Sequence, residues 1–131
     1  DIKVYKKLTE SGTKIQHICY GPEDIDLLSN LLDKAELSKT GTWCMFVIGH
    51  YSGKISNPEN ISPFVERLKK NNMNGDWAVC AFAKEEVSCL KMAIKLGGKI
   101  RVGFENSLLM PDGSVAPNNE TKVKAASTLF D

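Results

Sequence analysis

The sequence lacks the features that mark membrane and nucleic-acid-binding proteins. None of its apolar runs approaches the roughly 20 residues that a membrane helix needs, and no segment is typical of a signal peptide. The formal net charge is only +1, so neither a basic surface for nucleic acid nor a surface for an acidic partner is indicated. We therefore expect no nucleic-acid or membrane partner, and we expect a cytoplasmic protein.

Cysteine pairs with metal-binding spacing are also missing. The cysteines are Cys19, Cys44, Cys80 and Cys89, and no two of them form a CxxC pair. Three of the four lie in apolar, strand-like runs, where cysteine behaves as a small hydrophobic residue. The spacing does not favour a structural zinc knuckle, and the pattern favours a reducing compartment. The first residue is Asp1 rather than Met, which suggests a processed product or a piece of a longer protein.

What the sequence does contain is a regular alternation of apolar strand patterns and amphipathic helix patterns. The hydrophobic content of 42% and the charged content of 25% are those of an ordinary globular chain. After a helical segment at 1–10, strands are predicted at 14–20, 42–48, 76–83 and 99–105, and helices at 22–33, from about 61, at 85–96 and from Asn119. Strands that alternate with helices predict a parallel sheet.

Four strand–helix units predict half of a barrel. A complete (β/α)8 barrel takes about 250 residues, whereas this chain has 131. The alternative is a small open sheet with helices on both faces, but no glycine-rich phosphate loop follows the first strand. We therefore expect an α/β fold with four parallel βα units, and one partial domain over residues 1–131.

The last predicted strand, within Gly97–Ser107, has two different faces. Alternation places an apolar set on one face and a polar set on the other; these are Ile100, Val102 and Phe104, and Arg101, Gly103 and Glu105. In a barrel the polar set would point inward, with Glu105 at the carboxyl end, where barrel enzymes hold their chemistry. An extended strand would separate Arg101 and Glu105 by about 13 Å, too far for direct pairing. The alternative is a half-exposed strand whose charges are solvated.

The same stretch carries a family resemblance. The string GGKIRVGFE at 97–105, together with Trp77, Val79, Asn119 and the run TWCMFVIG, resembles the carboxyl-terminal half of the β-keto acid cleavage enzymes. This family includes the 3-keto-5-aminohexanoate cleavage enzyme. The resemblance implies the second half of a zinc-dependent TIM barrel, a transferase that condenses a β-keto acid with acetyl-CoA into acetoacetate and an acyl-CoA. It also implies an amino-terminal half-barrel segment or chain as partner, and a homo-oligomer.

The resemblance assigns roles to particular residues. Glu105 matches the carboxylate ligand of Zn²⁺, whose remaining ligands are expected outside this chain. Arg101 matches the arginine that binds the keto acid and stabilises its enolate. His50 follows a glycine at a strand end, on the rim of a barrel, and we expect it to contact substrate or CoA. His17 lies within a strand and is expected to be a core or interface residue.

Two departures from the family pattern keep a second interpretation open. The family has Asp directly after the zinc-binding Glu, as an acid–base group, whereas this chain has Asn106, which cannot transfer a proton. The His-x-His pair of the family's first half is absent. The alternative is a degenerate or truncated relative that acts as a non-catalytic assembly subunit, and a plain α/β binding module is a third hypothesis. We expect the isolated chain to be inactive, and its sequence does not specify which keto acid it would use.

Overall fold

The structure is a computed structural model, and it describes residues 2–50 and 52–131. Its helices are α1 (Ile2–Glu10), α2 (Pro22–Lys34), α3 (Ile61–Lys70), α4 (Glu86–Lys95) and α5 (Asn119–Ser127). Its strands are β1 (Gln16–Cys19), β2 (Trp43–Ile48), β3 (Trp77–Ala81) and β4 (Lys99–Ile100). No helix in the described residues is long and apolar enough to cross a membrane.

The four strands form one parallel sheet in the order β1-β2-β3-β4, which is also their order along the chain. Such an order arises when each strand is followed by a helix that returns the chain to the start of the next strand. β2 and β3 are apolar and buried almost throughout, as strands covered on both faces are. The predicted α/β fold with parallel βα units is therefore confirmed, and it corresponds to half of a TIM barrel.

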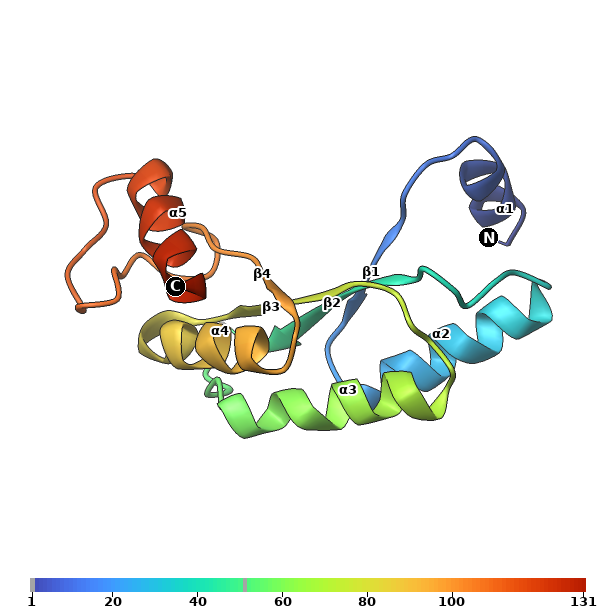
Figure 1. Cartoon of the computed structure of the whole chain (residues 1–131), viewed down its shortest axis with the longest axis horizontal. Helices are drawn as coiled ribbons and strands as arrows, with labels where there is room; N and C mark the ends of the chain where they lie inside the picture. The colour runs from blue at the N-terminus through green and yellow to red at the C-terminus, as the bar shows by residue number, and fades with distance from the viewer. Residues whose placement is uncertain (1, 51) are drawn as a thin grey trace.

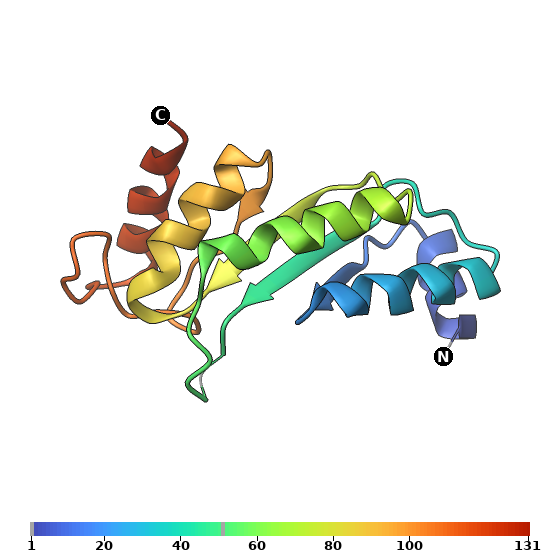
Figure 2. The same ribbon diagram turned by 90° about the horizontal axis from the view of Figure 1, so that it is seen from below.

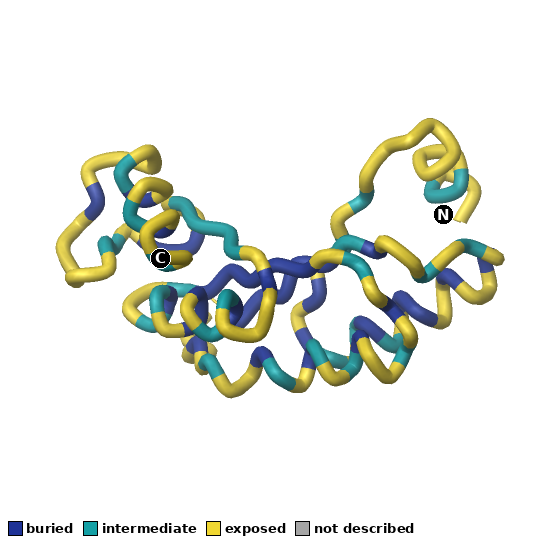
Figure 3. Tube along the Cα trace, in the orientation of Figure 1, coloured by how far each residue is buried: buried dark blue, intermediate teal, exposed yellow. Residues whose placement is uncertain are grey.

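The molecule is an open arc rather than a closed layer structure. Helices α2, α3 and α4 lie along one side of the sheet, and α1 and α5 stand at the two ends of the arc (Figures 1 and 2). Buried residues concentrate in the sheet and on the sides of the helices that face it, whereas α1 has none (Figure 3). The concave side of the arc is the face that a complete barrel would enclose.

The two faces of the sheet are packed differently. On the helix side, Phe46 stacks between Phe64 and Trp77, with ring centroids 4.7 and 5.2 Å apart. On the concave side lies a smaller cluster, which consists of Met45, Val47, Ala78 and Cys80 with Trp43 and Phe82 at its margins. The two sets alternate along β2 and β3, as the pleat requires. The larger cluster holds the helices to the sheet, and the smaller one forms the floor of the concave face.

The prediction of a strand that continues through Glu105 is wrong beyond the first residues of that strand. β4 has only two residues, and one further ladder bond follows, from the Arg101 N–H to the Val79 carbonyl at 2.9 Å. The chain then turns, since the Gly103 carbonyl accepts hydrogen bonds from the amides of residues 106 and 107 at 3.0 and 3.2 Å. The reason is the lack of a partner: β3 ends at Ala81, so no strand continues beside residues 103–105.

Candidate active site

The candidate site lies at the carboxyl edge of the sheet. Because the strands are parallel, β2, β3 and β4 all end at this edge. β2 leads into Gly49 and His50, β3 leads into Phe82, and β4 leads into Arg101 and the turn at 103–107. The two predicted functional segments, His50 and the stretch from Arg101 to Asn106, are thus brought to one edge from positions about 50 residues apart in the sequence.

Arg101 lies on the concave side and pairs with Glu105. Lys99, two residues earlier, sits 5.9 Å above the ring of Trp43 on that face, and alternation places Arg101 on the same side. The guanidinium donates to the Glu105 carboxylate, so the prediction that these two residues cannot pair was wrong. The turn after Gly103 folds Glu105 back toward Arg101, which an extended strand could not do.

The exposure of this ion pair determines how easily it can be opened. The side chains of Arg101 and Glu105 are 39% and 59% exposed. Ion pairs at such exposure contribute about 0–1 kcal/mol to stability, since water solvates the separated charges well. Either group can therefore turn to a ligand at little cost to the fold.

Asn106 differs from its neighbour Glu105 in being buried. It is 7% exposed, and its Oδ1 has no hydrogen-bond partner among the described residues. Its backbone carbonyl accepts the N–H of Ala83 at 3.2 Å, which ties the turn to the end of β3. Ala83 has φ +55°, a conformation that is unusual for a residue with a side chain. Asn106 is therefore held in place at the point where two strand ends meet.

Cys80 was missed as a member of this site by reasoning from the sequence. It lies on the concave face of β3, where continuation of the strand register places it opposite Arg101. Burial raises the pKa of its thiol, Arg101 lowers it, Glu105 raises it, and a hydrogen bond from Asn106 lowers it. The net direction is upward, so Cys80 is a neutral thiol at neutral pH. The only sequence signal was its inward position in an apolar strand, which also fits a core residue.

Ser56 ties the ends of β2 and β3 together, and nothing in the sequence indicated this. Its buried hydroxyl donates to the Ile48 carbonyl at 2.6 Å and accepts the Phe82 N–H at 2.9 Å. Gly49 makes room for it, because a Cβ there would lie 2.4 Å from the Ser56 oxygen. His50 follows on the exposed loop, with its Nδ1 2.7 Å from the Ser52 hydroxyl. His50 thus stands on the rim, on a loop whose base is fixed.

The loop after the turn is anchored by a buried ion pair. Lys122 of α5 donates to Glu86 of α4 at 2.7 Å, and both side chains are only 3% exposed. The same ammonium group donates to the Leu109 carbonyl at 2.7 Å. Burial raises the pKa of Glu86, while Lys122 and Ser107 act in the opposite direction. These contacts hold α4, α5 and the loop between residues 107 and 118 as one unit.

The described residues contain no group of three or more His, Cys, Asp or Glu side chains that could hold a metal ion. Glu105 is an accessible carboxylate at the carboxyl edge, and carboxylate oxygen is a normal zinc ligand. The chain therefore fits one position of a zinc site rather than a whole site. Any further ligands would come from outside the described residues.

A groove runs along the concave face beneath this edge. Its volume is about 530 Å³, and its walls come from the sheet, from α5 and from the short 3-10 helix that follows α5; they include Trp43, Met45, Arg101, Val123 and Phe130. Phe130 and Val123 are more than half exposed there. Lys99 and Arg101 also line the groove, and Arg101 is the one of the two that lies nearer the carboxyl edge.

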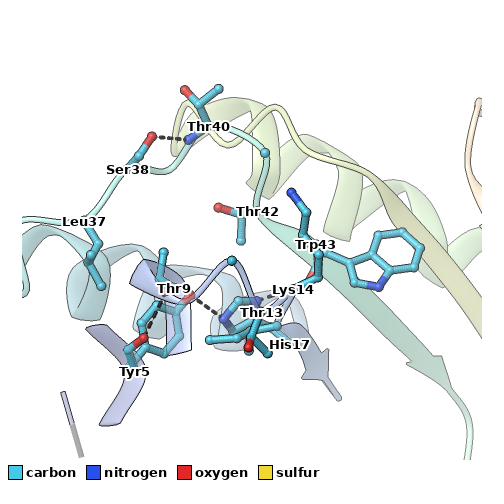
Figure 4. Close-up of a pocket in the computed structure, with 13 residues that line it drawn as sticks. Tyr5, Thr9, Thr13, Lys14, His17, Leu37, Ser38, Thr40, Thr42 and Trp43 are labelled. Atoms are coloured by element: carbon cyan, nitrogen blue, oxygen red, sulfur yellow. Dashed lines mark hydrogen bonds between the residues drawn. The ribbon is translucent and has the colours of Figure 1, made fainter. Parts of the chain in front are cut away.

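A second hollow, of about 210 Å³, lies at the opposite, amino edge between α1 and the starts of β1 and β2 (Figure 4). The Nδ1 of His17 is 3.1 Å from the Trp43 carbonyl and its Nε2 is 2.8 Å from the Tyr5 hydroxyl. A carbonyl can only accept, so Nδ1 carries the proton and Nε2 accepts from Tyr5. Burial lowers the pKa of His17, which keeps the ring neutral. Its contacts give His17 a structural role, joining α1 to the sheet.

An arc of four parallel βα units has the architecture of half of a (β/α)8 barrel, and Arg101 and Glu105 lie at its carboxyl edge. The family to which the chain belongs is more specific than this fold class. The chain matches the family described as beta-keto acid cleavage enzyme over residues 2–131, and it belongs to that family. The resemblance drawn from the string at 97–105 is thereby confirmed.

One curated relative carries a more specific name. The chain is 22% identical over 116 residues to a 3,5-dioxohexanoate:acetyl-CoA acetone transferase of Paraburkholderia graminis. The alignment covers 87% of this chain and 37% of the relative. The chain therefore spans little more than a third of the length of the relative that it matches.

Proposed function

We propose that this chain is the second half-barrel of a β-keto acid cleavage enzyme, a transferase that condenses a β-keto acid with acetyl-CoA into acetoacetate and an acyl-CoA. The observation that carries the proposal is the pairing of Arg101 with Glu105 at the carboxyl edge of a chain that belongs to this family throughout residues 2–131. A first half-barrel, in the same longer chain or in a partner, would complete the site. Assembly into a homo-oligomer is part of the same proposal.

Arg101 is proposed to bind the carboxylate of the keto acid. Its planar guanidinium can donate two parallel hydrogen bonds to a carboxylate, which fixes the orientation of the substrate as well as its charge. In the described structure these donors face Glu105. Arg101 would be free to bind the substrate if Glu105 served as a metal ligand, and its positive charge would then stabilise the negative charge of the enolate.

Glu105 is proposed as one ligand of a zinc ion whose other ligands, two histidines, lie outside this chain. Zinc, when bound, would polarise the keto oxygen of the substrate. Glu105 can serve because its carboxylate is accessible and because its turn is tied to β3 through Ala83 and Asn106. His50, on the rim after β2, is proposed to contact the substrate or CoA.

A second candidate function is a non-catalytic assembly subunit. Asn106 favours it, because an amide at this buried position cannot carry the proton that moves when the carbon–carbon bond forms or breaks. Arg101 and Glu105 favour the enzyme, since an assembly subunit needs neither group at the carboxyl edge. Turnover by the complete protein separates the two candidates.

The test of the proposed role of Arg101 is turnover by two variants of the complete protein. Arg101→Lys keeps the charge but loses the planar fork, and Arg101→Met loses both. We expect acetoacetate formation to fall by about 10²–10³-fold in Arg101→Met and by less in Arg101→Lys. The substrates are acetyl-CoA and a β-keto acid, with 3,5-dioxohexanoate as the first to try because a relative is named for it.

The control for this test is Arg67→Lys, which changes an arginine on α3 that pairs with Asp26 on the helical side. It should leave turnover at the native rate. If both Arg101 variants also keep the native rate, Arg101 is a structural residue and the proposed mechanism is wrong.

A further inference from the structure

The last helix begins with two adjacent asparagines that make different contacts. The side chain of Asn118 accepts the Thr121 N–H at 2.8 Å and caps α5. α5 thus begins at Asn119, where the sequence predicts the start of a helix, and the cap is the residue before it. Asn119 instead reaches outside its own helix, where its Oδ1 accepts the N–H of Phe104 at 3.0 Å.

Phe104 belongs to the turn that carries Glu105. The Gly103 carbonyl accepts the amides of residues 106 and 107, so residues 103–107 form a single helix-like turn. The first N–H groups of such a turn have no acceptor within it. Asn119 supplies the acceptor for Phe104, at the residue immediately before Glu105. The start of the turn is thus held by a side chain from a different element.

The helix that offers this side chain is itself fixed. One turn further along α5, Lys122 forms the buried contacts with Glu86 and with the Leu109 carbonyl. Asn119 therefore projects from a rigid support, and the two residues hold the start and the middle of the same loop. Nothing about capping α5 requires the Asn119 contact, since Asn118 already makes the cap.

We propose that Asn119 is a positioning residue for Glu105. By accepting the Phe104 N–H it fixes the turn, and with it the carboxylate that pairs with Arg101 and that would bind the metal. The proposal rests on the proposed function for its consequence in metal binding, but its structural part stands on the Asn119 and Lys122 contacts. Partners that orient a metal ligand typically change metal affinity by about 10–100-fold when they are lost.

The experiment compares three variants of the complete protein. Asn119→Leu keeps the shape but removes the acceptor, Asn119→Asp keeps an acceptor oxygen, and Asn118→Ala removes only the cap of α5. Three quantities are measured: amide hydrogen exchange at Phe104, the ¹³C shift of the Glu105 carboxylate, and the zinc dissociation constant by competition with a chelator.

In Asn119→Leu we expect exchange at Phe104 to speed up, the Glu105 signal to shift, and zinc binding to weaken by about 10–100-fold. Asn119→Asp should restore all three. Asn118→Ala should lower the thermal midpoint but leave the three readouts at native values. If Asn118→Ala and Asn119→Leu have the same effects, Asn119 only stabilises α5 and the proposal is wrong.

If the proposed function is wrong, the same experiment gives a different pattern of results. If Glu105→Gln, measured in parallel, binds zinc as the native protein does, the metal role of Glu105 is wrong. The positioning proposal is then decided by the Glu105 carboxylate signal, which Asn119→Leu must shift and Asn118→Ala must not. An unchanged signal in Asn119→Leu would overturn it.

Discussion

Asn106 is the residue whose chemistry most affects the expected rate. It is buried beside Cys80 at the point where the Glu105 turn meets the end of β3, and its amide cannot take or give a proton. Asn106→Asp would place a carboxyl group there, and burial would raise the pKa of that group toward neutrality. General acid–base catalysis is worth about 10²–10⁴-fold, so we expect turnover to rise by at least about tenfold.

The measurement is acetoacetate formation at saturating β-keto acid and acetyl-CoA, for the native complete protein and for Asn106→Asp. The native protein is expected to be slow. A native protein that is already fast, together with no gain in the variant, would mean that another group carries the proton. The interpretation of this chain as a degenerate relative would then fail.

Among the ion pairs of the described residues, the buried pair of Lys122 and Glu86 is expected to affect the free energy of unfolding most. Lys122→Met leaves the Glu86 carboxylate buried without a cation and should lower the free energy of unfolding by about 3–5 kcal/mol. The matched control is Lys124→Met on the same helix, whose pair with Glu120 is 75% exposed on both sides. That control should cost about 0–1 kcal/mol.

Denaturant unfolding of the two variants measures both values. Equal losses in Lys122→Met and Lys124→Met would contradict the buried pair. The double variant Glu86→Met with Lys122→Met should recover part of the loss, because no charge is then left buried without a partner.

For single residues, the sequence identified polar groups near predicted strand ends and missed groups whose role depends on distant partners. Arg101, Glu105, Asn106 and His50 could be singled out because charged or polar residues at strand ends suggest chemistry. Cys80, Ser56 and Lys122 could not, because their importance depends on partners far away in the sequence. A buried serine that joins two strand ends looks in the sequence like any loop serine.

At the scale of elements, α1 has the weakest attachment to the rest of the chain. It has no buried residues, and the Tyr5–His17 hydrogen bond joins it to the sheet. Because burial lowers the pKa of His17, the folded state favours the neutral ring. Its contribution to stability is therefore fully present above the unfolded-state pKa of about 6.5, and it is lost as the pH falls from there toward the lowered folded pKa.

We accordingly expect the free energy of unfolding to fall between pH 7.5 and pH 5, and to fall less in His17→Gln. The comparison is denaturant unfolding of both proteins at the two pH values, with circular dichroism as the probe. His50→Gln is the control, since His50 is exposed on a loop. If His17→Gln shows the same pH dependence as the native protein, the neutral ring does not attach α1.

Among the elements, the sequence predicted the buried strands well and the last strand poorly. β2 and β3 consist of apolar runs, which are typical of strands in a sheet that is covered on both faces. Their burial could therefore be predicted from their residues. In the segment after Ile100, the alternation of apolar and polar residues is equally clear, but a strand also needs a partner. The end of β3 at Ala81 removes that partner, and no local pattern shows where a neighbouring strand ends.

At the scale of the whole molecule, the arc has an open concave face. Ile18, on the edge strand β1, is 51% exposed, and Phe130, which lines the groove, is 56% exposed. Open edges and apolar faces of this kind are normally covered, because unpaired strand edges invite association. We propose that the first half-barrel covers them, and that residues 1–131 are therefore a partial domain.

We propose that this chain contributes Glu105 to a zinc site whose other ligands lie outside it. The most direct measurement is the zinc content of the purified complete protein and of Glu105→Gln, with Glu120→Gln on the exposed side of α5 as control. We predict bound zinc in the native protein and in the control, and a loss of most of it in Glu105→Gln. Equal zinc content in the native protein and in Glu105→Gln would mean that Glu105 is not a zinc ligand.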